Sequence, residues 1–371
     1  MKQKPTRPRR LQEAGLLLVI FVLGTLLSIF GGSVEMPKLE VDENGEPRRV
    51  FTEDSDGNRQ LVMEKKNKFL RAENLTNLAK DASFIAIMAV GATFIIVAGQ
   101  IDLSVGAIYA LSSVIGALVF HAFGPEGAKA GASAWLGVSL GMLACVATAT
   151  ACGLLNGGMV VALRVHPFII TLGTMAIYRG LAHVITQGQS ISQFPEVFRT
   201  MIRGDESTQL SIVPLIVMVV VAVIGTICLA RMAAGRRVYA VGGNEEAARF
   251  SGISVGRVKL GVFVVAGFTA GISSLLALGY YGGASSGDGN GYELDVIAAA
   301  VVGGASLSGG RGTALGALLG AIIIKMLDNG IIILGINSDY SRIIIGSAVI
   351  LAVVFDQLNG WMSRRRDLLS T

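Results

Sequence analysis

"VAGQIDLSVGAI", residues 97–108, places one carboxylate, Asp102, inside a stretch that is otherwise uncharged from Ala82 to Pro125. An ionised carboxylate in the hydrocarbon of a membrane is costly, so it is tolerated where the chain turns and meets water or backbone donors. On each side of Asp102 runs an apolar stretch about as long as a bilayer is thick, which is roughly 20 helical residues. We therefore predict that Asp102 lies between two membrane helices and caps the second one, with Ser104 helping to satisfy its first N–H groups.

The whole chain has the composition of a membrane protein. Of its 371 residues, 52% are hydrophobic and 15% are charged, and the mean hydropathy is +0.62. Soluble domains carry about 25% charged residues, so an ordinary globular fold is excluded. The 48 glycines suit helices that pack closely through small side chains. We predict an all-α polytopic membrane protein with about ten transmembrane helices, within a range of about eight to ten.

The basic residues account for the net charge of +5 without a nucleic-acid partner, because they gather at the two ends of the chain and in one loop. Cations beside membrane helices stay on the cytoplasmic side, and none of these groups is interleaved with aromatics as a base-stacking surface would be. We expect both termini and the loop to be cytoplasmic. The groups are Lys2, Lys4, Arg7, Arg9 and Arg10; Arg231, Arg236, Arg237, Arg249, Arg257 and Lys259; and Arg364, Arg365 and Arg366.

Uncharged apolar runs predict the order of the helices. The first run lacks a small-residue cleavage site, so we expect it to remain as a membrane helix. The run at 294–308 is short for a full crossing, and a re-entrant or broken helix is the alternative there. The expected spans are 11–33, 75–99, 103–120, 134–160, 167–185, 210–230, 260–281, 294–308, 313–334 and 341–361.

These spans divide the chain into four regions. Residues 1–33 form a basic N-terminus and the first span, 34–73 an external insert, 74–361 the main membrane domain, and 362–371 a basic tail. The insert mixes acidic and basic residues, and "RRVF" (48–51) and "RQLVM" (59–63) are candidate strands of a hairpin. A solvated, partly ordered loop is the alternative interpretation.

Glycines at a spacing of four predict close helix contacts. Gly312, Gly316 and Gly320 form a ladder in the span 313–334, and Gly153/Gly157 and Gly267/Gly271 repeat the spacing elsewhere. We expect the ladder to pack on a helix of the same subunit or of a partner.

Motifs for catalysis are weak. "GASSG" (283–287) spells a hydrolase elbow, but it follows a membrane helix instead of a strand, and His121, His166 and His183 have no evident acid partner. No GxxxxGK[ST] motif exists in the chain, so we expect no nucleotide, no other cofactor and no enzyme activity here. The cysteines Cys145, Cys152 and Cys228 lie in apolar runs without metal-binding spacing, which favours packing roles.

The cytoplasmic loop 235–259 contains a short predicted helix. In "NEEAARFSGI" (244–253), Asn244 is a helix start, acidic residues follow in the first turn, and Gly252 is a stop. Its apolar face, Ala247, Ala248 and Phe250, is small for burial in lipid headgroups, so docking to a protein groove is favoured over an interfacial helix without a partner.

Three motifs resemble one family. "GQIDLSVGAI" (99–108), "GGNEEAARFSGI" (242–253) and "GYELDVIAAAVVGGASLSGGRG" (291–312) occur in the order found in the ribose-type permease subunits of bacterial ATP-binding-cassette sugar importers, and the likeness extends from Asn74 to Asp356. The departures are Gln100, where glycine is usual, and the long insert 34–73. The resemblance implies the type II importer fold with inverted repeats.

The resemblance also implies partner proteins and a cellular location. They are a cytoplasmic ATPase that binds the Mg–ATP, a periplasmic sugar-binding protein, and a second permease subunit, identical or not, in the bacterial inner membrane. The loop helix would couple the ATPase to the membrane domain. The coupling residues carried over from the family are Gly243, Asn244, Glu245, Glu246, Ala247, Ala248 and Arg249.

A second acid-headed run mirrors the one that opens at Asp102. "GYELD" precedes "VIAAAVVGG", so we expect Asp295 to head a short helix that enters from the opposite face, as in transporters built from inverted repeats. Polar residues along such a path would contact the hydroxyls of a sugar weakly. The pathway candidates are Gln100, Asp102, Ser104, Tyr280, Tyr281, Asn290, Asp295 and Asn329.

The function that these patterns favour is inward transport of a monosaccharide such as ribose, xylose or galactose, powered by a separate ATPase. An ion-coupled secondary transporter of a small polar solute is the alternative. It would need carboxylates deep in several helices, and only Asp328, which is expected to pair with Lys325 at helical spacing, fits that description.

Overall fold

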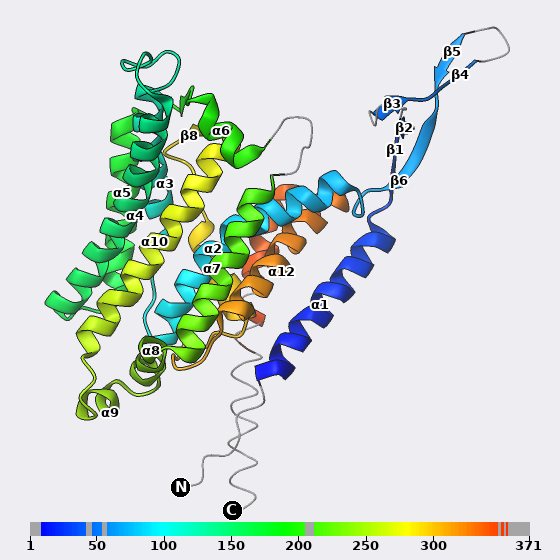
Figure 1. Cartoon of the computed structure of the whole chain (residues 1–371). Helices are drawn as coiled ribbons and strands as arrows, with labels where there is room; N and C mark the ends of the chain where they lie inside the picture. The colour runs from blue at the N-terminus through cyan, green and yellow to red at the C-terminus, as the bar shows by residue number, and fades with distance from the viewer. Residues whose placement is uncertain are drawn as a thin grey trace, which may run out of the picture.

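A computed structural model gives the fold of the chain (Figure 1) and describes residues 9–41, 47–53, 58–204, 211–347, 350, 351 and 354. Among these residues, eight helices are long and apolar enough to cross a membrane. The prediction of an all-α polytopic membrane protein is confirmed. The eight are α1 (Arg9–Phe30), α2 (Ala72–Val97), α3 (Val105–Ala122), α4 (Ala134–Leu163), α5 (Pro167–Thr186), α7 (Ile212–Arg231), α10 (Val255–Tyr281) and α12 (Ala314–Ile333).

The span expected at 294–308 is wrong as a full crossing. It is α11 (Tyr292–Val302), whose 11 residues are about half of what a bilayer needs. The span expected at 341–361 lies largely outside the described residues. Further short elements are α6 (Glu196–Arg203), α8 (Ala233–Gly243), α9 (Glu245–Phe250) and a 3-10 turn, η2 (Ser338–Tyr340).

The helix α2 is the buried axis of the membrane domain. In its most apolar window 94% of the residues are buried, against 6% for α1, which lies at the edge of the bundle beside α12 (Figure 1). The helices α10, α12, α7 and α11 pack around α2. Its hydroxyls therefore bond internally, and Thr93 Oγ1 donates to the Ala89 carbonyl at 2.8 Å.

Glycine pairs allow α4 and α10 to pack closely against each other. A Cβ added to Gly153 would lie 2.3 Å from the Phe263 carbonyl oxygen, and one added to Gly267 would lie 2.4 Å from that of Ala149. No larger side chain fits at either position without moving a helix. The sequence interpretation of this glycine spacing as a close contact is confirmed here.

The described residues 33–41, 47–53 and 58–67 form an arm that extends from the end of α1 away from the helices (Figure 1). The expected hairpin is confirmed in part, because Phe51 pairs with Leu61 in an antiparallel ladder, but each predicted strand is divided between two shorter strands. The described residues there are mostly exposed, as the alternative of a solvated segment also requires. At its base, Asn67 Nδ2 donates to the Ser28 carbonyl at 2.6 Å. The pairs are β1 (Ser33–Pro37) with β6 (Met63–Asn67), β2 (Leu39–Val41) with β3 (Pro47–Arg49), and β4 (Phe51–Glu53) with β5 (Arg59–Leu61).

The short helix α6 closes one end of the bundle. Phe198 stacks on Phe120 of α3 with ring centroids 4.0 Å apart, and Ile202 lies against Gly279 of α10. Nearby, strand β7 (Ile191–Ser192) pairs with β8 (Gly283–Ala284), which follows α10. Contacts with α6 and the pairing of β7 with β8 thus connect the end of α3 with the end of α10. The helices α8 and α9 lie at the opposite end (Figure 1).

Two helices begin inside the protein and run in opposite directions. The helix α3 starts after the non-helical segment 98–104, and the start of α11 lies beside it, since the Tyr109 and Tyr292 ring centroids are 5.3 Å apart. From there α3 runs to the α6 end, whereas the connection after α11 contacts Gly242 of α8. This is the arrangement that inverted repeats require.

Candidate functional site

Asp102 lies in the non-helical segment 98–104 and is 7% exposed. Its Oδ1 accepts hydrogen bonds from the Ser104 N–H at 2.8 Å and from Ser104 Oγ at 2.6 Å. The N-cap of α3 is Ser104, so the expectation that Asp102 itself caps the helix is wrong. The Asp102 carboxylate instead accepts the N–H of the cap residue. The other oxygen, Oδ2, has no hydrogen-bond partner among the described residues.

Neutral polar side chains extend this contact into α4 and α5. Asn156 Nδ2 donates to Ser104 Oγ at 2.7 Å, and the Tyr178 hydroxyl donates to Asn156 Oδ1 at 3.1 Å. Asn156 is fully buried. Sequence reasoning missed both residues, although a lone asparagine in the apolar run of α4 was the available signal. We name Asp102, Ser104, Asn156 and Tyr178 the neutral network.

A second group of carboxylates surrounds one lysine. Lys325 Nζ of α12 lies 2.9 Å from Asp295 Oδ2 of α11 and 2.8 Å from Asp328 Oδ2. The Ser341 hydroxyl donates to the remaining Asp328 oxygen. The expected pairing of Lys325 with Asp328 is confirmed, and Asp295 lies in the first turn of α11, whose N-cap is Gly291. We name Lys325, Asp295 and Asp328 the ionic cluster.

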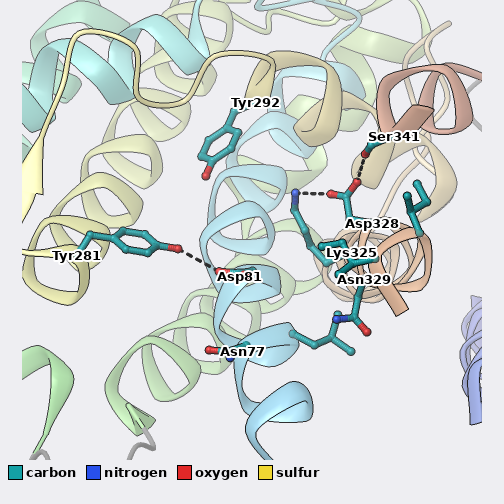
Figure 2. Close-up of a pocket in the computed structure, with 11 residues that line it drawn as sticks. Asn77, Asp81, Tyr281, Tyr292, Lys325, Asp328, Asn329 and Ser341 are labelled. Carbon is teal, nitrogen blue, oxygen red and sulfur yellow. Dashed lines mark hydrogen bonds and ion pairs between the residues drawn. The ribbon is translucent and has the colours of Figure 1, made fainter. Parts of the chain in front are cut away.

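The ionic cluster borders a cavity of about 400 Å³ between α2, α12 and the ends of α10 and α11. Figure 2 shows Tyr281 and Tyr292 pointing toward it from one side and Lys325 and Asp328 from the other. The Tyr281 hydroxyl donates to Asp81 Oδ1 of α2 at 3.1 Å. The cavity is lined by Asn77, Leu78, Asp81, Tyr281, Tyr292, Lys325, Asp328, Asn329, Ile331, Ile332 and Ser341.

The structure brings some of the pathway candidates to this cavity and leaves others apart. Tyr281 and Asn329 line it, whereas Asp295 pairs with Lys325 without lining the cavity. Tyr280 does not line the cavity. The centroid of its ring lies 4.2 Å from Nζ of the buried Lys80. Asn290 is exposed in the connection between α10 and α11.

Gln100 and Asp288 lie in the connections that lead to the two interior helix starts. Gln100 is buried, its Nε2 donates to the Gly99 carbonyl at 3.0 Å, and its Oε1 has no partner among the described residues. Asp288 Oδ2 accepts from the Ser285 N–H at 2.8 Å. Burial raises the pKa of the Asp288 carboxyl above its ordinary value, and this bond opposes the rise.

The glycine ladder packs inside the subunit. A Cβ on Gly316 would lie 2.1 Å from the Gly303 carbonyl oxygen, and one on Gly320 would lie 2.0 Å from that of Ala299, so both pack against α11. Gly312 does not belong to the ladder. It precedes α12 with a φ of +148°, beside Val97 and Ala305, because the helix begins only after the cap residue Thr313.

The helix α9 forms where the sequence predicts it. Asn244 Oδ1 accepts from the Ala247 N–H at 2.9 Å, and Gly252 ends the motif with a φ of +80°. Ala248 is buried against Val241 and Val255, so it holds the helix to the protein and is not part of an outward face, contrary to expectation. Phe250 is 90% exposed and is the apolar side chain that α9 presents.

The charged residues of α9 divide into an inner and an outer set. Glu245 pairs with Arg249 at 3.1 Å and with Lys259 of α10 at 2.8 Å. Glu246 is exposed, as are Gly243, Ala247 and Arg249. A protein bound to α9 would therefore meet Glu246, Ala247 and Phe250 first.

A chain of backbone contacts connects this end with the segment that carries Asp102. The Gly310 N–H donates to the Val97 carbonyl at 2.8 Å, and the Tyr239 hydroxyl of α8 donates to the Gly312 carbonyl at 2.6 Å. A Cβ on Gly242 would lie 1.7 Å from the Val97 carbonyl oxygen. The last turn of α8 is thus pressed against the end of α2, where the segment 98–104 begins.

The "GASSG" motif does not form a hydrolase elbow. It follows α10 and begins with the two-residue strand β8. His183 Nδ1 lies 3.4 Å from Ser286 Oγ, which is not the central serine of the motif. Ser285, the central serine, accepts the Gly287 N–H instead.

Bilayer-length helices around a polar cavity are typical of membrane transport proteins. The chain belongs to the family of permease components of branched-chain amino acid transport systems, whose model matches residues 74–354. No solved structure matches it.

Several relatives are named as sugar permeases. The ribose import permease of Bacillus subtilis is 39% identical, with 78% of this chain and 86% of the relative covered. The D-allose transport system permease of Escherichia coli is 35% identical, covering 78% and 85%. The galactose/methyl galactoside import permease of Haemophilus influenzae is 33% identical, covering 80% and 90%. The chain is a multi-pass permease subunit of the ATP-binding-cassette type, a class that works with a separate ATPase and a binding protein.

Proposed function

We propose that this chain is the membrane-spanning subunit through which a neutral monosaccharide enters the cell. The observation that carries the proposal is the similarity, over more than three quarters of the chain, to permeases named for ribose, allose and galactose. The cavity supports it, because two tyrosines, two amides and a hydroxyl among its lining residues are suited to a polyhydroxyl solute.

The energy comes from a separate ATPase that binds Mg–ATP, and this chain has no enzyme activity and no cofactor of its own. The absence of a GxxxxGK[ST] motif from the sequence supports this assignment. The ATPase docks on α9, and the coupling residues are Gly243, Asn244, Glu245, Glu246, Ala247 and Arg249, with Phe250 added by its exposure. Ala248 anchors the helix from within.

Movement of α9 reaches the membrane interior through α8. Since the turn at Gly242 presses on the end of α2 and Gly310 is bonded to Val97, a shift of α8 displaces the start of the segment 98–104. That segment carries Asp102 and the N-terminus of α3. A closed and an open pathway would then differ in the position of this segment relative to the start of α11.

The remaining assembly follows from the class and from the charge pattern. The chain lies in the bacterial inner membrane with both termini cytoplasmic, since basic residues cluster at both ends and in the loop that contains α8 and α9. A periplasmic sugar-binding protein delivers the substrate on the side of the β arm (residues 33–67) and α6. A second permease subunit, identical or related, completes the translocation unit.

Uptake by the assembled importer tests the function. Proteoliposomes containing the permease, its ATPase and its binding protein should accumulate radiolabelled ribose, allose or galactose only when ATP is present on the ATPase side. Accumulation driven by a proton or sodium gradient without ATP would instead support the alternative of a secondary transporter, which the ionic cluster favours because it places ionisable groups within α11 and α12.

Charge reversal tests the coupling role of α9. Glu246→Lys combined with Phe250→Ala alters only exposed side chains, so membrane insertion should be unchanged while ATP hydrolysis becomes uncoupled from uptake. Glu245→Lys should uncouple as well, but it also breaks the ion pairs with Arg249 and Lys259. Lys65→Glu on the distant β arm is the matched control, and normal uptake in the Glu246/Phe250 variant would remove the assigned role.

A further inference from the structure

We propose that the cavity beside the ionic cluster is a binding site for one neutral monosaccharide and that its charge excludes anionic sugar derivatives. This inference rests on the proposed function and goes further by naming the site and the charge of its ligand. The cavity volume of about 400 Å³ lies in the range of small-molecule sites. It lies in the half of the membrane domain nearer the β arm, where Asn74 of α2 pairs with Asn329 of α12 at 2.7 Å.

The hydrogen-bonding capacity of the cavity is only partly used within the protein. The Tyr281 hydroxyl is bonded to Asp81 and the Asn329 amide to Asn74. The Tyr292 hydroxyl and the Asn77 amide line the same cavity without a hydrogen-bond partner among the described residues. The two groups lie at different ends of the cavity (Figure 2), and each can both donate and accept, so they are suited to hydroxyls at two separate positions of a sugar.

The aromatic rings of the cavity are held in place by packing. The Tyr292 ring lies edge-on to Tyr109, with centroids 5.3 Å apart, and the Tyr281 ring is tilted against Phe84 at 6.0 Å. Tyrosine offers an apolar face and a polar tip at once. Because both rings are fixed before a ligand arrives, little side-chain entropy is lost on binding.

The charges around the cavity leave an excess of one negative charge. Lys325 is shared between Asp295 and Asp328, and the side chain of Lys80, outside the lining, lies 3.2 Å from Asp81. Two cations therefore face three carboxylates. A sugar phosphate or sugar acid would meet like charge in a partly desolvated site, whereas a neutral sugar would not.

Ligand-observed NMR on the full-length chain in lipid nanodiscs tests the site without any partner subunit. Saturation transfer from the protein to free ribose should be seen for the wild type and should fall at least about fivefold for the double variant Asn77→Ala, Tyr292→Phe, which loses two hydrogen-bonding groups. Tyr280→Phe is the matched control, since it removes the neighbouring hydroxyl outside the cavity, and its signal should equal that of the wild type. Equal signals for the double variant and the wild type, or no signal for the wild type, would overturn the proposal.

The charge of the ligand is tested with ribose 5-phosphate as the probe. It should give no saturation transfer with the wild type and a measurable signal with Asp81→Asn, which removes the excess charge and keeps the oxygen that accepts from Tyr281. Transfer to the wild type equal to that of ribose would contradict the exclusion. The ATP-dependent uptake assay separates the two hypotheses: normal uptake with unchanged ribose KM in the double variant would refute the site and leave the proposed function intact.

Discussion

The membrane domain keeps its interior carboxylates in two different ways. Asp102 is held by neutral groups: both of its hydrogen bonds come from Ser104, and its other oxygen has no partner within the part of the chain that the structure describes. Asp295 and Asp328 share the ammonium of Lys325. Removing the cation of a buried ion pair leaves an uncompensated charge, whereas a carboxylate that accepts bonds from neutral donors loses only the net contribution of each bond. The first arrangement suits a segment that must move, and the second suits a fixed wall of a site.

Loss of Lys325 should have the largest effect, because it breaks the ionic cluster. Lys325→Met leaves Asp295 and Asp328 without a cation, and we expect the free energy of unfolding to fall by about 3–5 kcal/mol. Thermal unfolding in one detergent, followed by intrinsic fluorescence, measures the loss. Lys65→Met, on a side chain 73% exposed in the β arm, is the control and should have almost no effect. An equal stability of both variants would mean that the cluster is hydrated.

The contact that positions the Asp102 segment should be nearly as sensitive. Gly242→Ala puts a Cβ 1.7 Å from the Val97 carbonyl oxygen, so α8 must move away from α2. We expect a loss of about 3 kcal/mol, at the upper end of overpacking costs, together with uncoupled ATP hydrolysis in the assembled importer. Gly261→Ala in α10 is the matched control, since a Cβ there meets nothing within 4 Å. Equal coupling in the two variants would disprove the link through α8.

Neutralising Asp295 and Asp102 in separate variants compares the ionic cluster with the neutral network directly. Asp295→Asn weakens a charge-assisted bond to Lys325 and should cost roughly 1.5–3 kcal/mol. Asp102→Asn keeps the oxygen that accepts from Ser104 and loses no cation, so its cost should stay below about 1 kcal/mol. Unfolding of the two variants under identical conditions decides the matter, and similar costs would show that the two carboxylates are held alike.

The smallest effect is expected at the edge of the neutral network. Tyr178→Phe removes the hydroxyl that donates to Asn156 Oδ1 and should cost about 0.5–1.5 kcal/mol. Tyr340→Phe, at an exposed position in η2, is the control. A loss for Tyr178→Phe as large as that for Lys325→Met would mean that the neutral network is as tightly coupled as the ionic cluster.

The sequence predicted those features that depend only on residues close together in the chain. Hydropathy located the long helices, and Asn244 and Gly252 marked the ends of the α9 motif, because a cap and a left-handed glycine act within a few residues. The pairing of Lys325 with Asp328, three residues apart on α12, was predictable for the same reason.

Features that depend on distant segments were not predictable. Asn156 belongs to the Asp102 network only because α4 lies against the start of α3, 52 residues away in sequence. Gly312 matched the glycine spacing of the ladder, but contacts with Val97 and Ala305 keep it in a loop. Likewise, Ala248 was expected on an outward face, and only the packing of Val241 and Val255 shows that it faces inward.

The β arm differs from the segment 98–104 in how much change of length each one tolerates. Every strand of the arm pairs with another strand of the arm, and the arm joins the helices through a base that includes Asn67 and Phe69. Evolution or an engineer can therefore lengthen, shorten or replace its tip, for instance with a fluorescent tag, while the helices keep their register. Deleting one residue between 98 and 104 would instead displace α3 by up to about 3.3 Å, because the bond from Gly310 to Val97 and the bonds from Ser104 to Asp102 hold the two ends of this segment.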